Sequence, residues 1–198
     1  FRPPSAGMPQ SGKPEDVGGE YRAMIAYVHD TLDNLKKRFP GYDEKAGYEI
    51  AGFVWFQGYN DQFDETGRKE YGKNLVCLIK DLRKEFKAPE MKVVVGVLGV
   101  NGGKNEVGKQ KDVRDGQRYV NTAAEFKGNV KAIRTDVLVD TAAEELFPSW
   151  RKNPDQWNKV GGDFPYHYLG SAIWFNRIGK AMGESMLELL KNQKEGER

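Results

Sequence analysis

The sequence has 198 residues, a length that suits one globular domain with a sizeable hydrophobic core. Its 31 Lys and Arg residues nearly balance its 29 Asp and Glu residues, which argues against a nucleic-acid-binding surface. No apolar run approaches the ~20 residues of a membrane-spanning helix, and the single cysteine, Cys77, excludes an intrachain disulfide.

Residues 1–19 are rich in Pro, Gly and Ser and predict an irregular segment. The chain opens with FRPP, without a methionine or a signal-peptide pattern, so we expect a processed product or a piece of a longer chain. An amphipathic helix should follow over residues 20–39, because apolar residues recur there at spacings of three and four. His29 lies off that apolar stripe, which is typical of a solvated helix residue.

The most apolar stretch, residues 48–56, predicts a β-strand. Its centre, IAGFVWF, has no polar side chain, which suits a strand buried inside a parallel sheet. The run then breaks into five polar or flexible residues: Gln57, Gly58, Tyr59, Asn60 and Asp61. Such groups at the carboxyl end of a central α/β strand are where these folds place their chemistry, although an ordinary polar loop has the same composition.

A second amphipathic helix is expected over residues 69–86, with Cys77 on its apolar side as a buried, inert thiol. The β-branched run at residues 92–100 predicts another buried strand. Residues 104–116 are charged and lack periodicity, so we expect a loop there, with a weak helix over residues 112–126.

The third predicted strand covers residues 130–140, and Asp140 at its end is either a site residue or a helix N-cap. Residues 143–162 predict a long irregular connection that carries Trp150 and Trp157.

The last predicted helix spans residues 169–190 and is followed by a polar, frayed tail over residues 191–198. Its inward face is expected to hold Ile173, Ile178, Met182, Met186 and either Leu189 or Leu190. The alternation of helices and strands implies right-handed crossovers and a parallel sheet with helices on both faces. We therefore expect one α/β domain over residues 1–198.

Two groups of residues could carry chemistry. Gly58 lets the backbone approach a bound group, and the Asn60 amide can donate to a developing oxyanion. Asp163 and His167 precede the last helix, and a histidine beside a carboxylate can take a proton from a hydroxyl nucleophile. His167 is equally typical of a histidine that packs between its two tyrosine neighbours at a helix start.

Together these motifs resemble the SGNH hydrolases. The tetrapeptide GYND at residues 58–61 matches the GxND block of that superfamily, and Asp163 with His167 resembles its last block. The strings GFVWFQGYND, PYHYLGSA and FRPPSAG are similar to the sialate O-acetylesterase-like branch, the carbohydrate acetyl esterases. The resemblance spans nearly the whole chain.

The resemblance implies a flavodoxin-like, three-layer α/β/α fold and Ser-His-Asp hydrolysis of acetyl esters on sugars. His167 would be the general base, Asp163 its orienting partner and Asn60 an oxyanion-hole donor, while Gln57 and Gly58 would shape the hole. The expected partner is an acetylated saccharide, not nucleic acid or a membrane. No Cys/His cluster suggests zinc, and no cofactor is expected. The branch suggests a periplasmic or secreted protein, while the sequence itself leaves the compartment open.

The chain departs from the family pattern at the nucleophile. It has no GDS- or GQS-like turn after a first strand, and the family's second glycine block is absent. None of its five serines has the family's context: Ser5, Ser11, Ser149, Ser171 and Ser185. Ser171 is expected to cap or pack at the start of the last helix. The Asp163–His167 spacing is one residue longer than the family's DxxH, and Tyr59 stands where many branch members have Glu.

Three strands are also few, since sheets average about five to six, and a strand as apolar as residues 48–56 needs neighbours on both sides. We therefore expect that the chain is the C-terminal part of a longer domain. An upstream fragment or a second chain would complete the sheet and supply the serine. The alternative is a non-catalytic saccharide-binding or scaffold module, in which Trp55, Trp150, Trp157, Tyr166 and Tyr168 would either stack on sugars or pack in the core.

Overall fold

The computed structural model describes residues 1–9, 13, 17–100, 108–162, 165 and 167–196. The chain divides into two compact units, each described by itself. One contains Phe1–Ala51 and Lys73–Met91, and the other contains Gly52–Gly72 and Lys92–Arg198.

The first unit is helical and contains α1 (Gly19–Asp33), α2 (Leu35–Arg38) and most of α4 (Tyr71–Glu85). The predicted helix over residues 20–39 is correct in position, but Asn34, with φ −113° and ψ 21°, divides it into α1 and α2. His29 Nε2 on α1 lies 2.7 Å from Glu85 Oε1 on α4, and its side chain is 47% exposed, as expected of a solvated histidine. Cys77 on α4 is half-buried.

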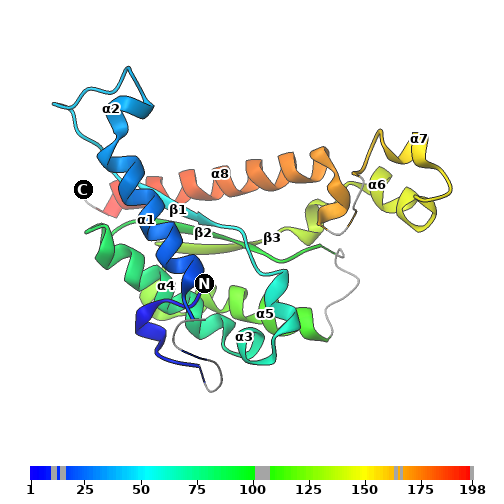
Figure 1. Ribbon diagram of the computed structural model, residues 1–198, viewed down its shortest axis with the longest axis horizontal. Coiled ribbons are helices and arrows are strands. Elements are labelled where there is room, and N and C mark those ends of the chain that lie inside the picture. The colour runs from blue at the N-terminus through cyan, green and yellow to red at the C-terminus, as the bar shows by residue number, and fades with distance from the viewer. Residues whose placement is uncertain (10–12, 14–16, 101–107, 163–164, 166, 197–198) are drawn as a thin grey trace. The chain divides into compact units, whose positions relative to one another are not determined.

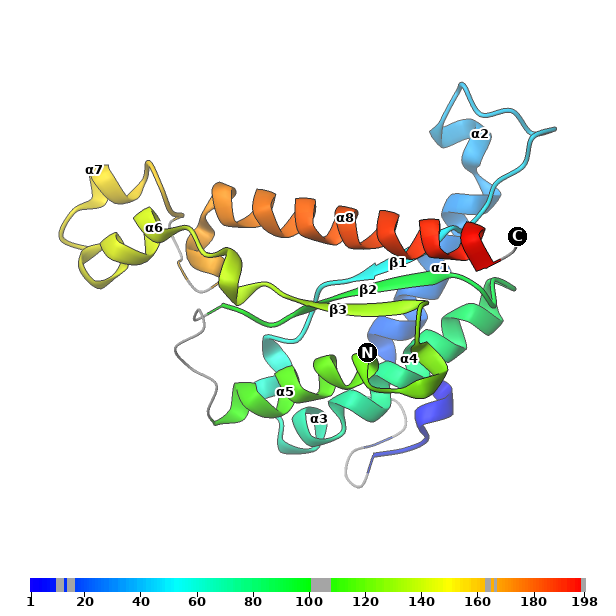
Figure 2. The same ribbon diagram turned by 180° about the vertical axis from the view of Figure 1, so that it is seen from behind.

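The second unit is built on a parallel sheet of three strands in the order β1-β2-β3 (Figure 1). The strands are β1 (Gly52–Trp55), β2 (Lys92–Val97) and β3 (Val130–Arg134), with Gly52 opposite Lys92 and Val93 opposite Val130. Helix α8 (Ala172–Gly196) lies along one face, and α3 (Glu65–Lys69) and α5 (Lys109–Arg118) lie on the other (Figures 1 and 2). The predicted α/β fold with a parallel sheet and helices on both faces is confirmed.

The strand predicted over residues 48–56 is shorter and more exposed than expected. Among the described strands, β1 pairs with β2 alone, and Val54 is 48% exposed. The central strand is instead β2, and all of its residues are buried. Apolar composition thus identified both strands, but it could not tell the edge of this sheet from its centre.

The loop predicted over residues 104–116 is wrong for residues 109–116, which belong to α5; residues 101–107 lie outside the described part. Two short 3₁₀ helices, Tyr119–Asn121 and Ala124–Phe126, follow α5. The buried face of α5 consists of Val113, Arg114 and Gln117, so it has almost no apolar periodicity to reveal it.

Beyond β3 the chain is more helical than predicted. A 3₁₀ helix, Asp136–Leu138, replaces the end of the predicted strand, and Asp140 is the N-cap of α6 (Thr141–Leu146), accepting from Ala142 N at 3.2 Å. The connection predicted as irregular also contains the 3₁₀ helix Phe147–Ser149 and α7 (Pro154–Trp157). Trp157 is buried, so it packs in the core instead of forming a sugar-stacking surface.

Helix α8 begins after Ser171, whose Oγ accepts from Trp174 N at 3.2 Å, which confirms the expected cap. Ile173 is 49% exposed, and the buried position of that turn belongs to Trp174. The inward positions Ile178, Met182 and Leu189 are confirmed. The helix continues to Gly196, so the tail predicted over residues 191–198 is helical over residues 191–196.

Candidate active site

A cavity of about 300 Å³ lies at the carboxyl edge of the sheet in the second unit. It is lined by the loop after β1, by the chain after β2 and by the approach to α8: Phe56, Gln57, Gly58, Tyr59, Asn60, Leu98, Val100, His167, Tyr168 and Phe175. Four residues singled out in the sequence therefore meet here: Gln57, Gly58, Asn60 and His167. Asp163 lies outside the described residues.

Gly58 has a backbone conformation that only glycine adopts readily. Its φ is +140°, and a Cβ built on it would lie 2.9 Å from both Gln117 Nε2 and Val113 Cγ1. The short 3₁₀ helix Asn60–Phe63 begins two residues later, which leaves the Asn60 side chain exposed at the cavity.

The side-chain amide of Gln57 is engaged inside its own loop. Its Oε1 accepts from the Tyr71 hydroxyl at 3.0 Å, and its Nε2 donates to Asp61 Oδ2 at 2.5 Å. The same hydroxyl accepts from Trp55 Nε1 at 3.0 Å. Burial raises the pKa of Tyr71 above its usual value, so the hydroxyl stays protonated. Gln57 therefore shapes the loop from within.

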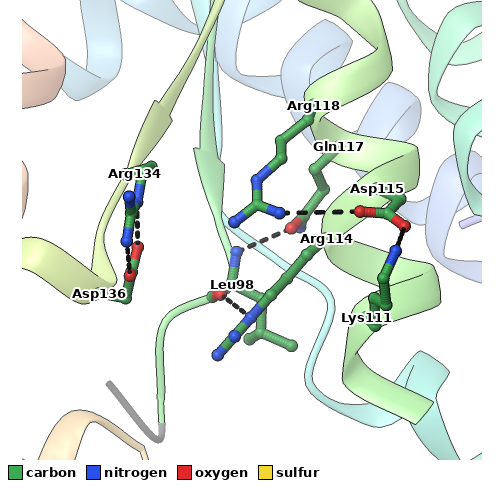
Figure 3. A network of polar contacts seen from close by, with 8 residues as sticks. All are labelled: Leu98, Lys111, Arg114, Asp115, Gln117, Arg118, Arg134 and Asp136. Carbon is green, nitrogen blue, oxygen red and sulfur yellow. Dashed lines mark hydrogen bonds and ion pairs between the residues drawn. The ribbon is translucent and has the colours of Figure 1, made fainter. Parts of the chain in front are cut away.

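Helix α5 joins the ends of β1 and β2 through a residue that the sequence gave no reason to select. Gln117 Nε2 donates to Gln57 O at 2.7 Å, and Gln117 Oε1 accepts from Leu98 N at 2.7 Å. Arg114 Nε donates to Leu98 O, also at 2.7 Å, so α5 holds both polar groups of the Leu98 main chain (Figure 3). No sequence signal marks these two side chains, because they lie in a charged segment with hardly any apolar residue.

His167 is exposed and lies against the β1 loop. Its ring centroid is 4.4 Å from that of Tyr59, with the planes tilted by 59°, and Tyr59 meets Phe63 edge-on at 5.8 Å. The imidazole and the Asn60 amide are thus brought to one cavity from distant parts of the chain.

No serine described in the second unit lines this cavity. Ser171 is buried, and its Oγ donates to Asp140 Oδ2 at 2.6 Å, so Asp140 belongs to a structural contact. Ser149 Oγ donates to Leu146 O at 3.3 Å, and Ser185 is buried on α8. Ser5 lies in the first unit, and Ser11 lies outside the described residues.

The described part of the chain has neither a cluster of metal ligands nor a helix suited to span a membrane. Nowhere in it do three or more His, Cys, Asp or Glu side chains gather as a metal site would need. None of its helices combines the length and the apolar character required to cross a membrane.

A layered α/β unit with polar loops at the carboxyl edge of a parallel sheet is the arrangement of SGNH-like hydrolases. Residues 16–146, more than half of the chain, match the family described as carbohydrate esterase, sialic acid-specific acetylesterase. The chain belongs to this family, which confirms the resemblance seen in the sequence. The matched range includes Gln57, Gly58 and Asn60 and ends before His167.

Similarity to individual proteins is consistent with this assignment. A stretch of 59 residues is 34% identical to a probable carbohydrate esterase of Arabidopsis thaliana, covering 30% of this chain and 23% of that protein. The X-ray structure of the Arabidopsis protein matches with a TM-score of 0.51 at 19% identity, covering 84% of this chain and 51% of that chain. The structural likeness shows the fold, and the chain spans about half of the solved relative.

Proposed function

We propose that this chain holds the base and oxyanion side of a carbohydrate O-acetyl esterase. In this proposal His167 is the general base, Asp163 orients it, and Asn60 donates to the oxyanion, while Gln57 and Gly58 shape the hole. The substrate is an acetyl ester on a saccharide, in keeping with the family. The observation that carries the proposal is that Asn60 and His167 line one cavity.

The chemistry would follow the usual course of acyl transfer. A serine hydroxyl attacks the acetyl carbonyl while His167 takes its proton, and the Asn60 amide stabilises the negative oxygen of the tetrahedral intermediate. His167 then returns the proton to the departing sugar oxygen. Water, activated by the same imidazole, attacks the acetyl-enzyme and releases acetate together with the free serine.

The serine is proposed to come from a segment that also adds a strand beside β1, either an N-terminal fragment or a second chain. Support comes from the two edges of the sheet. At β3, the Asn121 side chain donates to Ala132 O at 2.9 Å and accepts from Ala132 N at 2.7 Å, which blocks that edge. Strand β1 is paired with β2 alone among the described strands and leaves Val54 48% exposed.

The origin of the serine is tested with an aryl acetate. The 198-residue chain is assayed alone and as the product of its full reading frame, and we expect turnover only in the second case. Turnover by the chain alone that Ser5→Ala or Ser11→Ala abolishes would overturn the external serine. Ser149→Ala is the matched control, because this hydroxyl bonds to Leu146 O and to Asn153 Nδ2 and does not line the cavity.

The role of the base is tested in the active form. Because triad members act as a unit, His167→Ala should lower kcat by ~10³-fold or more. Asn60→Ala should lower it by ~10²–10³-fold, as expected for one oxyanion donor. The other histidine of the chain, His29, lies on α1 in the first unit, so His29→Ala should keep full activity. Near-normal activity of His167→Ala would rule out the proposed base.

A second candidate function is saccharide binding without hydrolysis. It is favoured by the aromatic side chains in the cavity lining, Phe56, Tyr59, Tyr168 and Phe175, and by the lack of a serine in that lining. Aromatic faces can stack on sugar rings. Calorimetric titration with acetylated saccharides would support this candidate if they bind to the full reading-frame product and no acetate is released.

A further inference from the structure

We infer that Tyr168 is a positioning residue for His167, because its buried hydroxyl holds a left-handed turn that sets the direction of the imidazole. The functional part of this inference rests on the proposed role of His167 as the base. The sequence indicates Tyr168 as an aromatic neighbour of His167 and as a sugar-stacking or core residue, but not as a support for the histidine.

The three residues after His167 wind in the left-handed sense. Their φ angles are +52° at Tyr168, +58° at Leu169 and +63° at Gly170. Two hydrogen bonds close the turn, from Gly170 N to His167 O at 2.9 Å and from Ser171 N to Tyr168 O at 3.0 Å. A left-handed conformation costs an L-residue ~1–2 kcal/mol, so the surroundings must hold Tyr168 and Leu169 in place.

The Tyr168 hydroxyl anchors the turn to the sheet by hydrogen bonds. It lies 3.1 Å from Gly99 N, which donates to it, and 3.2 Å from Thr135 Oγ1. Thr135 Oγ1 uses its own proton to donate to Val97 O at 2.6 Å, so the tyrosine is the donor to Thr135. The hydroxyl is therefore tied to the ends of both β2 and β3. Burial raises the pKa of Tyr168, which keeps the phenol protonated for these contacts.

Two further contacts hold the turn: the packing of the Tyr168 ring and a backbone contact with Gly162. The Tyr168 ring packs against Phe56 at 5.2 Å and edge-on against Trp174 at 5.0 Å, measured between ring centroids. On the other side, Gly162 N donates to Leu169 O at 3.1 Å, and a Cβ on Gly170 would lie 2.5 Å from Gly162 N. The left-handed turn is thus fixed from two directions.

This arrangement determines where His167 points. Its carbonyl is the first acceptor of the turn, so the backbone of the histidine is fixed to the turn, while its ring rests against Tyr59 at 4.4 Å. The base is thereby located relative to the ends of all three strands. A catalytic side chain needs this kind of support, since a displacement of ~1 Å can cost about 10²-fold in rate.

The test is an NMR comparison of wild type and Tyr168→Phe, which keeps the ring and removes the hydroxyl. The readouts are the ring-proton shifts of His167 and its nuclear Overhauser effects to Tyr59. We expect the shifts to move toward those of a solvent-exposed histidine and the Overhauser effects to be lost. His29 lies 5.6 Å from Phe86 and is the internal reference, whose signals should not change. Tyr119→Phe, at an exposed tyrosine of the same unit, is the matched control.

A purely structural role would lower the stability without moving the His167 signals, so the urea-unfolding midpoint is measured alongside. Unchanged shifts and Overhauser effects in Tyr168→Phe would overturn the inference. If that variant does not fold, Thr135→Val removes the acceptor of the tyrosine hydroxyl and should move the His167 signals in the same direction. Unchanged signals in a folded Thr135→Val would then overturn it.

An activity measurement separates this inference from the proposed function. In the active form, Tyr168→Phe should lower kcat by ~10–10²-fold with little change in KM. If His167→Ala keeps activity while Tyr168→Phe shifts the His167 signals, the proposed function fails and the positioning stands. If His167→Ala is inactive while Tyr168→Phe changes neither signals nor kcat, the positioning alone fails.

Discussion

Single polar side chains fix the strand ends that build the cavity. Gln117 is fully buried and uses one amide to join two main chains, those of Gln57 and Leu98. A buried hydrogen bond adds little net stability to the folded protein. Removing only one of its two partners is costly, because the remaining buried donor keeps its full desolvation penalty.

Gln117→Leu is expected to destabilise the protein by about 1–3 kcal/mol, because it leaves Leu98 N–H without its acceptor. Gln57 O also loses its amide donor, and the Tyr71 hydroxyl at 3.1 Å has only one proton, which Gln57 Oε1 at 3.0 Å also attracts. Urea unfolding measures the change. Lys111→Ala, on the exposed face of the same helix, is the control and should leave the midpoint in place. A midpoint equal to wild type in Gln117→Leu would show that Leu98 finds another acceptor.

Asp136 at the end of β3 predicts a pH dependence of stability. Burial alone would raise the pKa of its carboxyl, but the hydrogen bonds and charge of Arg134, with a contribution from Arg114, lower it below the ordinary value. The Arg134 contact is bidentate, with Nε–Oδ1 at 3.1 Å and Nη2–Oδ2 at 2.5 Å (Figure 3).

A carboxyl with a lowered pKa in the folded state contributes stability above its unfolded pKa of about 4, and this is lost as the pH falls through the folded value. Asp136→Asn should therefore be less stable than wild type at pH 7, and the difference should narrow as the pH falls below 4. Urea unfolding at several pH values checks this. Glu145→Gln, at an exposed position on α6, controls for the loss of one carboxylate. A difference that does not vary with pH would contradict the prediction.

At the scale of elements, α5 packs against the start of α4 through two glycines. A Cβ on Gly116 would lie 2.6 Å from Gly72 N and 3.2 Å from Gly72 Cα. The contact is backbone against backbone, so no flexible side chain can move aside. Close approach here brings Gln117, the next residue of α5, to the ends of the strands.

Gly116→Ala is therefore expected to destabilise the protein by about 1–3 kcal/mol through overpacking. The same substitution at Gly179 on α8 is the matched control, because its Cβ would meet nothing within 4 Å. Gly179→Ala should stabilise by about 0.5–1 kcal/mol, since alanine is the better helix former. Thermal unfolding should show a lower Tm for Gly116→Ala and a higher Tm for Gly179→Ala than for wild type. Changes in Tm of the same sign in both variants would contradict the described packing.

The elements that sequence analysis located correctly are those with an apolar pattern. Strand β2 and helix α8 carry continuous or periodic apolar residues, and both were expected. Helix α5 was expected only as a weak helix over residues 112–126, with its start placed inside a loop, because the groups it buries are mostly polar and their partners are backbone atoms distant in sequence. Apolar periodicity reveals a helix face that packs against apolar surface. It does not reveal a face whose polar side chains are buried by hydrogen bonding to main-chain groups.

At the scale of the whole molecule, the candidate site also contains residues that the sequence predicts and residues that only the fold reveals. Gln57, Gly58, Asn60 and His167 could be selected because residue type and local motif suggest chemistry. The roles of Gln117 and Tyr168 could not, because each depends on which strand ends the fold brings within hydrogen-bonding distance. The left-handed turn after His167 was equally hidden, since only Gly170 among its three residues is of a type that favours positive φ.

The two edges of the sheet lead to a prediction for the entire protein. Asn121 blocks β3 by bonding both main-chain groups of Ala132, whereas β1 is paired with β2 alone in the described sheet and exposes Val54. An unpaired edge with apolar side chains is where a further strand can add. The residue after β1, Phe56, lines the cavity, so a strand added beside β1 would run next to the site.

Hydrogen–deuterium exchange tests this directly. In the 198-residue chain, amides of Gly52–Trp55 should exchange faster than those of Lys92–Val97, because β2 has a neighbour on each side. In the product of the full reading frame, β1 should become protected while Ala132 on β3 is equally protected in both forms, since its edge is already blocked. If β1 is as protected as β2 in the shorter chain, or gains nothing in the longer one, the strand that brings the serine does not dock at β1, and the external serine loses its structural support.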